Sequence, residues 1–228
     1  MTRMNSLMKR TKILHRIVAN TWIYDHAQLL VGARQVHNHI AAQIAYLCSA
    51  TVVLDLGGGT GTLRRLWPAT RAYICLDIDL QKLRRFKRKY PDGIALLSDA
   101  THSPIRSGSV DVVLCMVVAH HVPDSLLIPL IGESGRVLKR TGRFIFMDAI
   151  WNPQRWIGRL LWKYDRGSYP RTGEVLLSTL SHHYTITRSE RFSVFHEYIL
   201  CIGTRCLAQP SLSTHSDGVG YSSAFMKD

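Results

Sequence analysis

The chain has 228 residues and a mass of 25.8 kDa, which is long enough for one sizeable domain with its own hydrophobic core. No apolar run approaches the roughly 18 residues that cross a membrane, and the five cysteines form no C-x-x-C pair, which argues against a disulfide framework or a zinc site. The formal net charge of +13 favours acidic partners such as phosphates, nucleic acid or anionic lipid headgroups. We therefore expect a cytoplasmic protein without a bound metal ion, whose surface can make peripheral contact with an anionic membrane.

The first 50 residues carry apolar side chains at helical spacing from about Ser6 to Leu47. Asn20 and Thr21 can interrupt this pattern, with Thr21 as the cap of a second helix. We expect residues 1–50 to form an N-terminal helical segment.

A glycine-rich stretch follows this segment. Residues 52–56 predict a short buried strand, because they are apolar and begin with two β-branched side chains. Residues 62–67 are expected to begin a helix, whose N-terminal N–H groups would suit a carboxylate or a phosphate. Glycines between the two elements let the backbone turn with positive φ and let a ligand approach closely. These glycines are Gly57, Gly58, Gly59 and Gly61.

The spacing of the glycines argues against a dinucleotide cofactor. A dinucleotide fingerprint needs G-x-G-x-x-G/A, but its last position falls on Thr62 or Arg64 in this chain. The pattern that is present is Asp55-x-Gly57-x-Gly59-x-Gly61. It predicts a nucleotide-like ligand other than NAD.

A second strand is expected over residues 72–76, and it ends at Asp77, about twenty residues past the first glycine. An acidic residue at this point can accept hydrogen bonds from both hydroxyls of a ribose. Asp79 is the alternative, and we favour Asp77.

The next helix, residues 80–90, combines an apolar stripe with a strongly basic surface. Leu83 and Phe86 are expected to face inward. The basic surface is either an anionic docking face, for RNA or a membrane, or a solvated helix face. Nucleic acid is not favoured, because we see neither exposed aromatic side chains nor a separate binding module. The cations are Lys82, Arg84, Arg85, Lys87, Arg88 and Lys89.

Three further strands are predicted before residue 150, and a helical insert follows them. The strands are residues 94–97, residues 110–118, and a strand that begins after the turn near Gly142 and ends at Asp148. In the insert, Trp156 and Tyr164 belong to one predicted apolar stripe, and a second short helix ends at Leu180. The closing strands are expected at residues 192–195 and 198–202.

Several of these motifs resemble the class I S-adenosylmethionine (SAM)-dependent methyltransferases. The resemblance covers roughly residues 20–150, and it is strongest for the broad type 11 group that includes the ubiquinone and menaquinone-biosynthesis C-methyltransferases. Val110 replaces the usual phenylalanine, and Arg140-Thr141-Gly142 replaces Pro-Gly-Gly; both changes concern packing and turn shape. The motifs are Asp55-x-Gly57-x-Gly59-x-Gly61, Asp99-Ala100, Ser109-Val110-Asp111, the run from His120 to Asp124, and Arg136-Val137-Leu138-Lys139.

The resemblance implies an α/β, Rossmann-like fold: a seven-stranded, mostly parallel sheet with an antiparallel last strand and helices on both faces. It implies that residues 1–50 pack on the cofactor site, and that residues 51–206 form the SAM-binding methyltransferase domain. The substrate insert would lie at about residues 151–181. Residues 207–228 are rich in serine and glycine, and we expect a loose tail there.

The resemblance also implies roles at the cofactor site. The glycine loop would contact the methionine and ribose portions of SAM, with Asp55 ordering the loop or approaching the amino group. Asp77 would bind the ribose, and Asp99 and Ala100 would bind the adenine. The implied cofactor-binding set is Asp55, Gly57, Gly58, Gly59, Gly61, Asp77, Ile78, Asp99, Ala100 and Met116.

Catalytic and substrate-binding residues are harder to assign from the pattern. The candidates for a general base are His120, His121 and Asp148. Tyr164, Arg166 and Arg171 could bind an anionic or hydroxylated acceptor, and an ordinary loop ion pair is the alternative. The expected function is methyl transfer from SAM (EC 2.1.1.-) to a small-molecule or lipid-like acceptor. The alternatives are an RNA methyltransferase and a SAM-binding regulator without catalysis.

Overall fold

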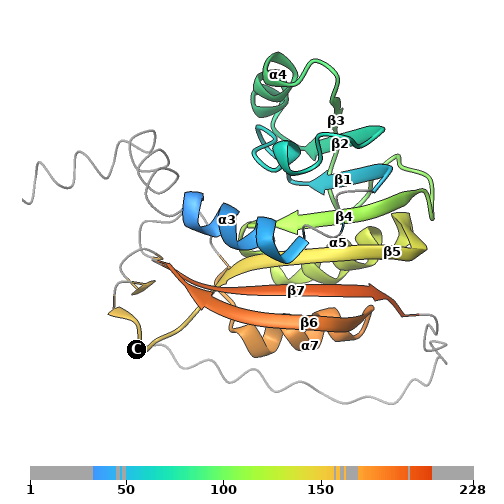
Figure 1. Ribbon diagram of the computed structural model, residues 1–228. Helices are drawn as coiled ribbons and strands as arrows, with labels where there is room; N and C mark the ends of the chain where they lie inside the picture. Colours follow the sequence, from blue (N-terminus) through green and yellow to red (C-terminus); the bar gives the residue numbers. More distant parts are fainter. Residues whose placement is uncertain are drawn as a thin grey trace, which may run out of the picture.

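The computed structural model describes residues 33–44, 47, 50–156, 158–159, 162, 169–194 and 196–206 (Figure 1). The expected tail at 207–228 and most of the expected N-terminal segment lie outside these residues. The predictions that residues 1–50 pack on the cofactor site and that the tail is loose therefore stay predictions. No helix in the described part of the chain is long and apolar enough to cross a membrane.

One seven-stranded sheet organises the chain, with the order β3-β2-β1-β4-β5-β7-β6. The pairs from β3 to β5 are parallel, and β7 runs antiparallel to both of its neighbours, β5 and β6. This confirms the predicted fold class. The strands are β1 (Val52–Leu56), β2 (Ala72–Asp77), β3 (Ile94–Leu97), β4 (Val110–Met116), β5 (Leu138–Ile150), β6 (Tyr184–Ser193) and β7 (Glu197–Arg205).

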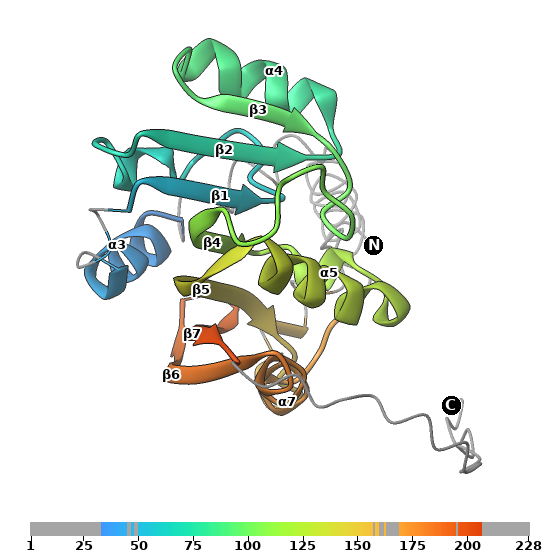
Figure 2. The same cartoon turned by 90° about the vertical axis from the view of Figure 1, so that its right-hand side faces the viewer.

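Helices cover both faces of the sheet, so its central strands are buried on both sides and read as nearly continuous apolar runs (Figure 2). One core layer joins the sheet to α3 (Ala33–Ile44) and α4 (Leu80–Lys89). The other joins it to α5 (Asp124–Val137) and α7 (Gly173–Ser181). Leu83 and Phe86 of α4 point inward as predicted, and Cys75 and Cys115 are buried.

The helix expected after the glycine loop is much shorter than predicted. Only one 3₁₀ turn, η2 (Arg64–Leu66), forms between the loop and β2. Pro68 explains the difference, because its ring disfavours the helical conformation of the preceding residue, and Trp67 is indeed non-helical with φ −125° and ψ 61°. The loop therefore has no helix N-terminus to offer an anion.

Three strand boundaries also differ from the prediction. β4 ends at Met116, because Val117 takes a positive φ of 60°. β5 starts directly after α5, and the expected turn is a break in register: Val110 pairs with Leu138, but Val112 pairs with Arg143. β6 begins at Tyr184, whereas only residues 192–195 were predicted, because this edge strand is mostly exposed and its sequence is polar.

The insert also packs differently from the prediction. Trp156 is helical but 67% exposed, so it does not belong to a buried stripe. Trp162, which the predicted stripe left out, is 8% exposed. Tyr164 and Arg166 lie outside the described residues.

Candidate active site

The candidate site lies at the carboxyl ends of the parallel strands. β1 has β2 on one side and β4 on the other, so the chain order reverses at this point of the sheet. Ligands of open α/β sheets bind in the crevice outside such a reversal. The glycine loop follows β1 directly, and the predicted residues of β2, β3, β4 and β5 end at the same edge of the sheet.

The glycine loop is shaped by glycines with positive φ. Gly57, Gly59 and Gly61 have φ values of 66°, 58° and 71°. A Cβ on Gly61 would clash with the ring of Phe86, so this glycine serves packing. A Cβ on Gly59 would meet nothing closer than 3.6 Å, so the backbone there is open to a ligand.

Asp77 and Asp79 have different tasks. Asp77 is 4% exposed; its Oδ2 accepts a hydrogen bond from the Gly59 N–H at 2.9 Å, and its Oδ1 accepts one from the Asp79 N–H at 2.8 Å. Asp79 caps α4, because its Oδ1 accepts from the N–H groups of Gln81 and Lys82. Asp77 thus connects β2 to the glycine loop, whereas Asp79 is committed to the helix.

Asp55 supports the loop from the core. It is 2% exposed, and its Oδ2 accepts a hydrogen bond of 2.6 Å from the Tyr73 hydroxyl. A Cβ on Gly58 would lie 2.5 Å from the same carboxylate oxygen, so the loop rests directly on this side chain. Burial raises the pKa of Asp55 to about 7, although the hydrogen bond from Tyr73 lowers it. Of the two predicted roles, the structure favours ordering of the loop.

At the end of β3, Asp99 is exposed. Its Oδ1 accepts from the N–H and from the hydroxyl of Thr101, both at 2.8 Å, and these hydrogen bonds lower the pKa of the carboxyl. Its Oδ2 accepts no hydrogen bond from the described residues. Ala100 follows it half-buried, Ile78 is 77% exposed beside Asp77, and Met116 is the half-buried last residue of β4.

These residues fit a SAM molecule. A carboxylate has about four lone-pair sites, and the described residues occupy two of them on Asp77, which leaves two for ribose hydroxyls. The Asp99 Oδ2 can accept from an amino group, the exposed Ile78 side chain offers an apolar surface to a ring, and Gly59 leaves its backbone open.

Two of the three candidate bases form a buried pair. The Nδ1 atom of His120 lies 2.5 Å from the Asp148 Oδ1, and the His120 backbone N–H donates to Oδ2 at 3.1 Å. Asp148 also accepts from the Ala149 N–H at 2.7 Å. His120 is 4% exposed and Asp148 is fully buried, while His121 is exposed with its ring centroid 4.0 Å from that of His120. Asp148 therefore orients the imidazole of His120, and the sequence could not show which histidine it would hold.

The turn that carries His120 is held in an unusual conformation. It comprises Val117 and Val118, followed by η3 (Ala119–His121). Val117 is β-branched, 41% exposed and has a φ of 60°, and its N–H donates to the Met147 carbonyl at 2.7 Å. Such strained residues cluster at functional sites, where surrounding structure holds them.

Arg171 is engaged within the protein, which favours the predicted alternative of a loop ion pair over a role in acceptor binding. It is 7% exposed, and its guanidinium donates to the carbonyls of Ala119 and Val122, both at 2.7 Å, and to Asp124 at 2.8 Å. These bonds anchor the His120 turn to the end of the insert. An anionic acceptor would have to compete with all of them, so we assign Arg171 a structural role instead.

Sequence reasoning assigned no role to Tyr73, Thr101 and the anchoring of the His120 turn. An Asp-x-Thr sequence is a known signal for local hydrogen bonding, so the Asp99–Thr101 contact could have been found. Tyr73 could not, because its closeness to Asp55 depends on the register in which Asp55 pairs with Cys75.

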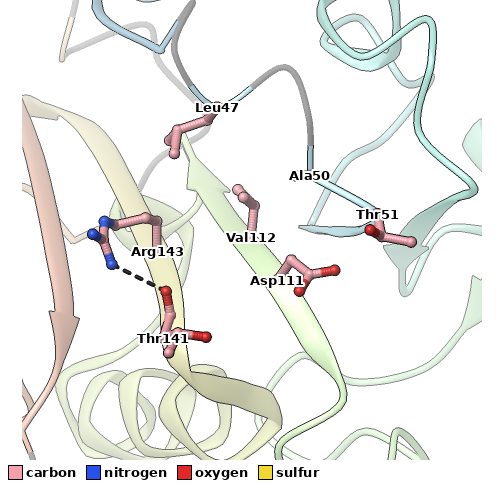
Figure 3. A pocket seen from close by; sticks show the side chains of 7 residues that line it. All are labelled: Leu47, Ala50, Thr51, Asp111, Val112, Thr141 and Arg143. Atoms are coloured by element: carbon pink, nitrogen blue, oxygen red, sulfur yellow. Dashed lines mark hydrogen bonds between the residues drawn. The ribbon is translucent and has the colours of Figure 1, made fainter.

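A cavity of about 270 Å³ lies elsewhere, at the amino ends of β1 and β4 (Figure 3). The side chains of Asp111, Val112 and Arg143 line it, and Arg143 donates to the Thr141 carbonyl at 3.0 Å. None of the predicted site residues lines this cavity. We therefore place the candidate active site at the glycine loop and not here.

Part of the chain matches a known protein family. Residues 54–146 match the family model described as "Methyltransferase domain". An uncharacterized protein of Methanocaldococcus jannaschii, MJ0638, is 34% identical over 94 residues, which are 41% of this chain and 39% of the relative. The match thus spans about two-fifths of the relative's length.

Two solved structures share the fold. Magnesium protoporphyrin IX methyltransferase from Synechocystis PCC 6803 with bound SAH is 17% identical, with a TM-score of 0.66 over 86% of this chain and 100% of that chain. Geranyl diphosphate C-methyltransferase from Streptomyces coelicolor A3(2), in complex with S-adenosyl-L-homocysteine, is 12% identical, with a TM-score of 0.62 over 76% and 80% of the two chains. Residues 54–146 thus match a methyltransferase domain, and the chain shares its fold with solved SAM-dependent methyltransferases that hold SAH.

Proposed function

We propose that this chain transfers a methyl group from SAM to a small-molecule or lipid-like acceptor, and that His120 takes a proton from that acceptor. The observation that carries the proposal is the closeness of the glycine loop to the His120 turn. A Cβ on Gly57 would lie 2.6 Å from the Cγ2 of Val118, two residues before His120. The buried His120–Asp148 pair therefore stands next to the loop proposed to hold the cofactor.

The cofactor-binding roles follow from the geometry of each group. Asp77 would accept from the ribose hydroxyls and Asp99 from the adenine amino group, with Ile78 and the Ala100 N–H against the ring. The glycine loop and Met116 would hold the methionine portion. When bound, SAM supplies a methyl group that is already activated on a sulfonium.

The residues of the chain then have two tasks. Holding both reactants in line can lower the barrier by roughly 7–11 kcal/mol, and it needs no particular side chain. A general base adds about 10²–10⁴ in rate. With Asp148 accepting from Nδ1–H, His120 is held in the tautomer whose Nε2 atom carries the lone pair, which is the form that a general base needs. Asp148 would then offset the positive charge of the imidazolium.

The acceptor is proposed to be apolar or ring-bearing. Trp156 and Tyr169 of the insert are 67% and 38% exposed, and they offer amphipathic surface to a ring or chain. The names of the two structural neighbours give a porphyrin and a prenyl diphosphate as acceptors, which supports this class. Tyr164 and Arg166 remain proposed acceptor-binding residues, whereas Arg171 supports the His120 turn.

The test uses SAM with a tritium-labelled methyl group and an extract separated into lipid and polar fractions. We expect label in an extractable small molecule or lipid with the wild-type chain, and much less with His120→Ala. Calorimetry with SAM provides the separate readout, and both proteins should bind it equally. Binding without transfer to any fraction would contradict the proposed catalysis and favour a SAM-binding regulator, while label in RNA would contradict the acceptor class.

A further inference from the structure

The outer face of α4 is a basic surface that the proposed chemistry does not use. Residues 64–92 contain nine lysines and arginines but only three aspartates. α4 lies at the outer end of the sheet, against the edge strand β3, so its outer face turns away from the rest of the molecule (Figures 1 and 2). A helix of ten residues presents a strip about 15 Å long.

Three arginines on this strip have no partner among the described residues. Arg84, Arg85 and Arg88 are exposed, and no described carboxylate lies within ion-pair distance of them. The other cations are partly engaged. The Nζ of Lys87 donates to two carbonyls at the end of the helix, and the Nζ of Lys89 lies 5.0 Å from the centre of the Tyr90 ring. The part of the chain that the structure describes thus leaves the excess positive charge on this face without neutralising carboxylates.

Exposed aliphatic side chains occur on the same helix and on the neighbouring edge strand. Leu80 begins α4 and is 44% exposed, while Ile94 and Leu97 at the two ends of β3 are 48% and 54% exposed. Leu97 pairs in register with Asp77, so the aliphatic edge reaches the proposed ribose-binding carboxylate. Cations flanked by exposed aliphatic groups are typical of surfaces that lie in a lipid interface.

We propose that α4 and the β3 edge dock this protein on an anionic lipid bilayer. The cations would bind the headgroups, and Leu80, Ile94 and Leu97 would enter the outer acyl region. Single-stranded nucleic acid fits less well, because its bases need aromatic side chains for stacking. Tyr90, the aromatic residue at the end of α4, is half-buried and packs on Phe86.

Docking in this way places the cofactor edge of the sheet next to the lipid. The N-terminus of α4, Leu97 and Asp77 all lie at the carboxyl ends of the strands, where the candidate active site opens. A lipid-like acceptor could therefore reach the site from the bilayer. The docking itself does not depend on the proposed methyl transfer and is tested without an acceptor.

The test compares binding to vesicles of phosphatidylcholine alone with binding to vesicles containing roughly one-third phosphatidylglycerol. We expect the wild-type chain to sediment only with the anionic vesicles. Binding should weaken between about 0.1 M and about 1 M salt, because the Debye length shortens from about 10 Å to about 3 Å. The triple variant Arg84→Glu, Arg85→Glu, Arg88→Glu should lose about 100-fold or more in partitioning.

The matched control makes the same change in net charge on other surfaces, at the exposed residues Arg106, Arg140 and Arg188. The partitioning of this control variant onto anionic vesicles should fall by less than about tenfold, since only the long-range electrostatic attraction changes. Equal losses in the two triple variants would overturn the proposal, as would equal binding to both kinds of vesicle.

A second pair of measurements separates lipid from nucleic acid. Replacing Ile94 and Leu97 together by glutamine should weaken vesicle binding without changing the net charge, and circular dichroism confirms that the variant is folded. Fluorescence anisotropy with a labelled RNA oligonucleotide at physiological salt completes the comparison. If the chain binds the RNA through the three arginines and does not bind anionic vesicles, the docking surface serves nucleic acid and the proposal is wrong.

Discussion

Replacing Asp77 by alanine is expected to weaken the binding of SAM, and replacing Asp79 by alanine provides its control. The two residues are of one type and stand two positions apart, but their contacts differ. Asp77 accepts from the Gly59 N–H at the glycine loop, whereas Asp79 accepts from two N–H groups in the first turn of α4.

The structure gives a magnitude for each change. A hydrogen bond to a charged group contributes about 1.5–3 kcal/mol, so losing even one ribose contact at Asp77 corresponds to roughly a 10- to 150-fold loss of affinity. Asp77→Ala also leaves two backbone N–H groups without their acceptor, which lowers the free energy of unfolding by about 1–3 kcal/mol. Asp79→Ala removes a helix cap, which lowers it by about 0.5–2 kcal/mol.

The two variants should therefore lose similar stability but very different affinity. Calorimetry with SAM measures the affinity, and urea denaturation without ligand measures the free energy of unfolding. We expect Asp77→Ala to bind SAM at least tenfold more weakly, and Asp79→Ala to stay within about threefold of the wild type. If Asp79→Ala loses the affinity and Asp77→Ala keeps it, the assignment of the ribose carboxylate is wrong.

Three further predictions concern other parts of the site. Asp148→Asn should lower turnover by about 10²–10⁴, as His120→Ala does, with SAM affinity unchanged in calorimetry; full activity in either variant would remove the pair from catalysis. The pKa of Asp55 is about 7 in the folded chain and 3.8 in the unfolded chain, so the protonated side chain stabilises the fold. This contribution to the free energy of unfolding is fully present below about pH 4 and is lost as the pH rises to about 7. Relative to Asp55→Asn, the wild type should therefore lose up to about 4 kcal/mol of unfolding free energy over this range, and parallel pH curves would refute the shift. Gly61→Ala should lower the thermal stability clearly more than Gly108→Ala. Both glycines have positive φ, but only a Cβ at position 61 would clash with an aromatic ring. Equal losses of stability would mean that the positive φ alone accounts for the cost.

Local patterns in the sequence were enough to predict much of the sheet. Strand β3 matches its predicted residues, and β2 ends at Asp77 as the spacing from the first glycine required. These features depend on a few neighbouring residues, namely apolar runs, glycines and a carboxylate at the end of a strand. The fold class was implied by the family resemblance that the motifs carry.

Features that depend on distant partners could not be predicted in the same way. Arginine is a residue type that often binds anionic groups, so Arg171 was a plausible acceptor-binding residue. Its partners, however, include main-chain carbonyls some fifty residues earlier, which no side-chain pattern reveals. Tyr184 begins a strand whose outward side is polar. The position of this residue is set by its ring, which stacks on the ring of Phe144 with the two centroids 4.1 Å apart. The shortened helix after the glycine loop is a different case, because Pro68 was visible in the sequence and its effect on Trp67 was overlooked.

The anchoring by Arg171 has a consequence for how acceptor preference can change over evolution. The Trp151 N–H donates to the Arg171 carbonyl at 2.8 Å, and this bond closes the stretch between the two residues at its base. The partners of the Arg171 side chain include two carbonyl oxygens, which every amino acid supplies, so substitutions at Ala119 and Val122 leave those acceptors in place. Positions of this stretch that do not contact the turn, such as the exposed Trp156, can therefore change while the anchor stays in place. If the proposed function is correct, new acceptor preferences arise at such positions while the turn that carries the proposed general base keeps its shape.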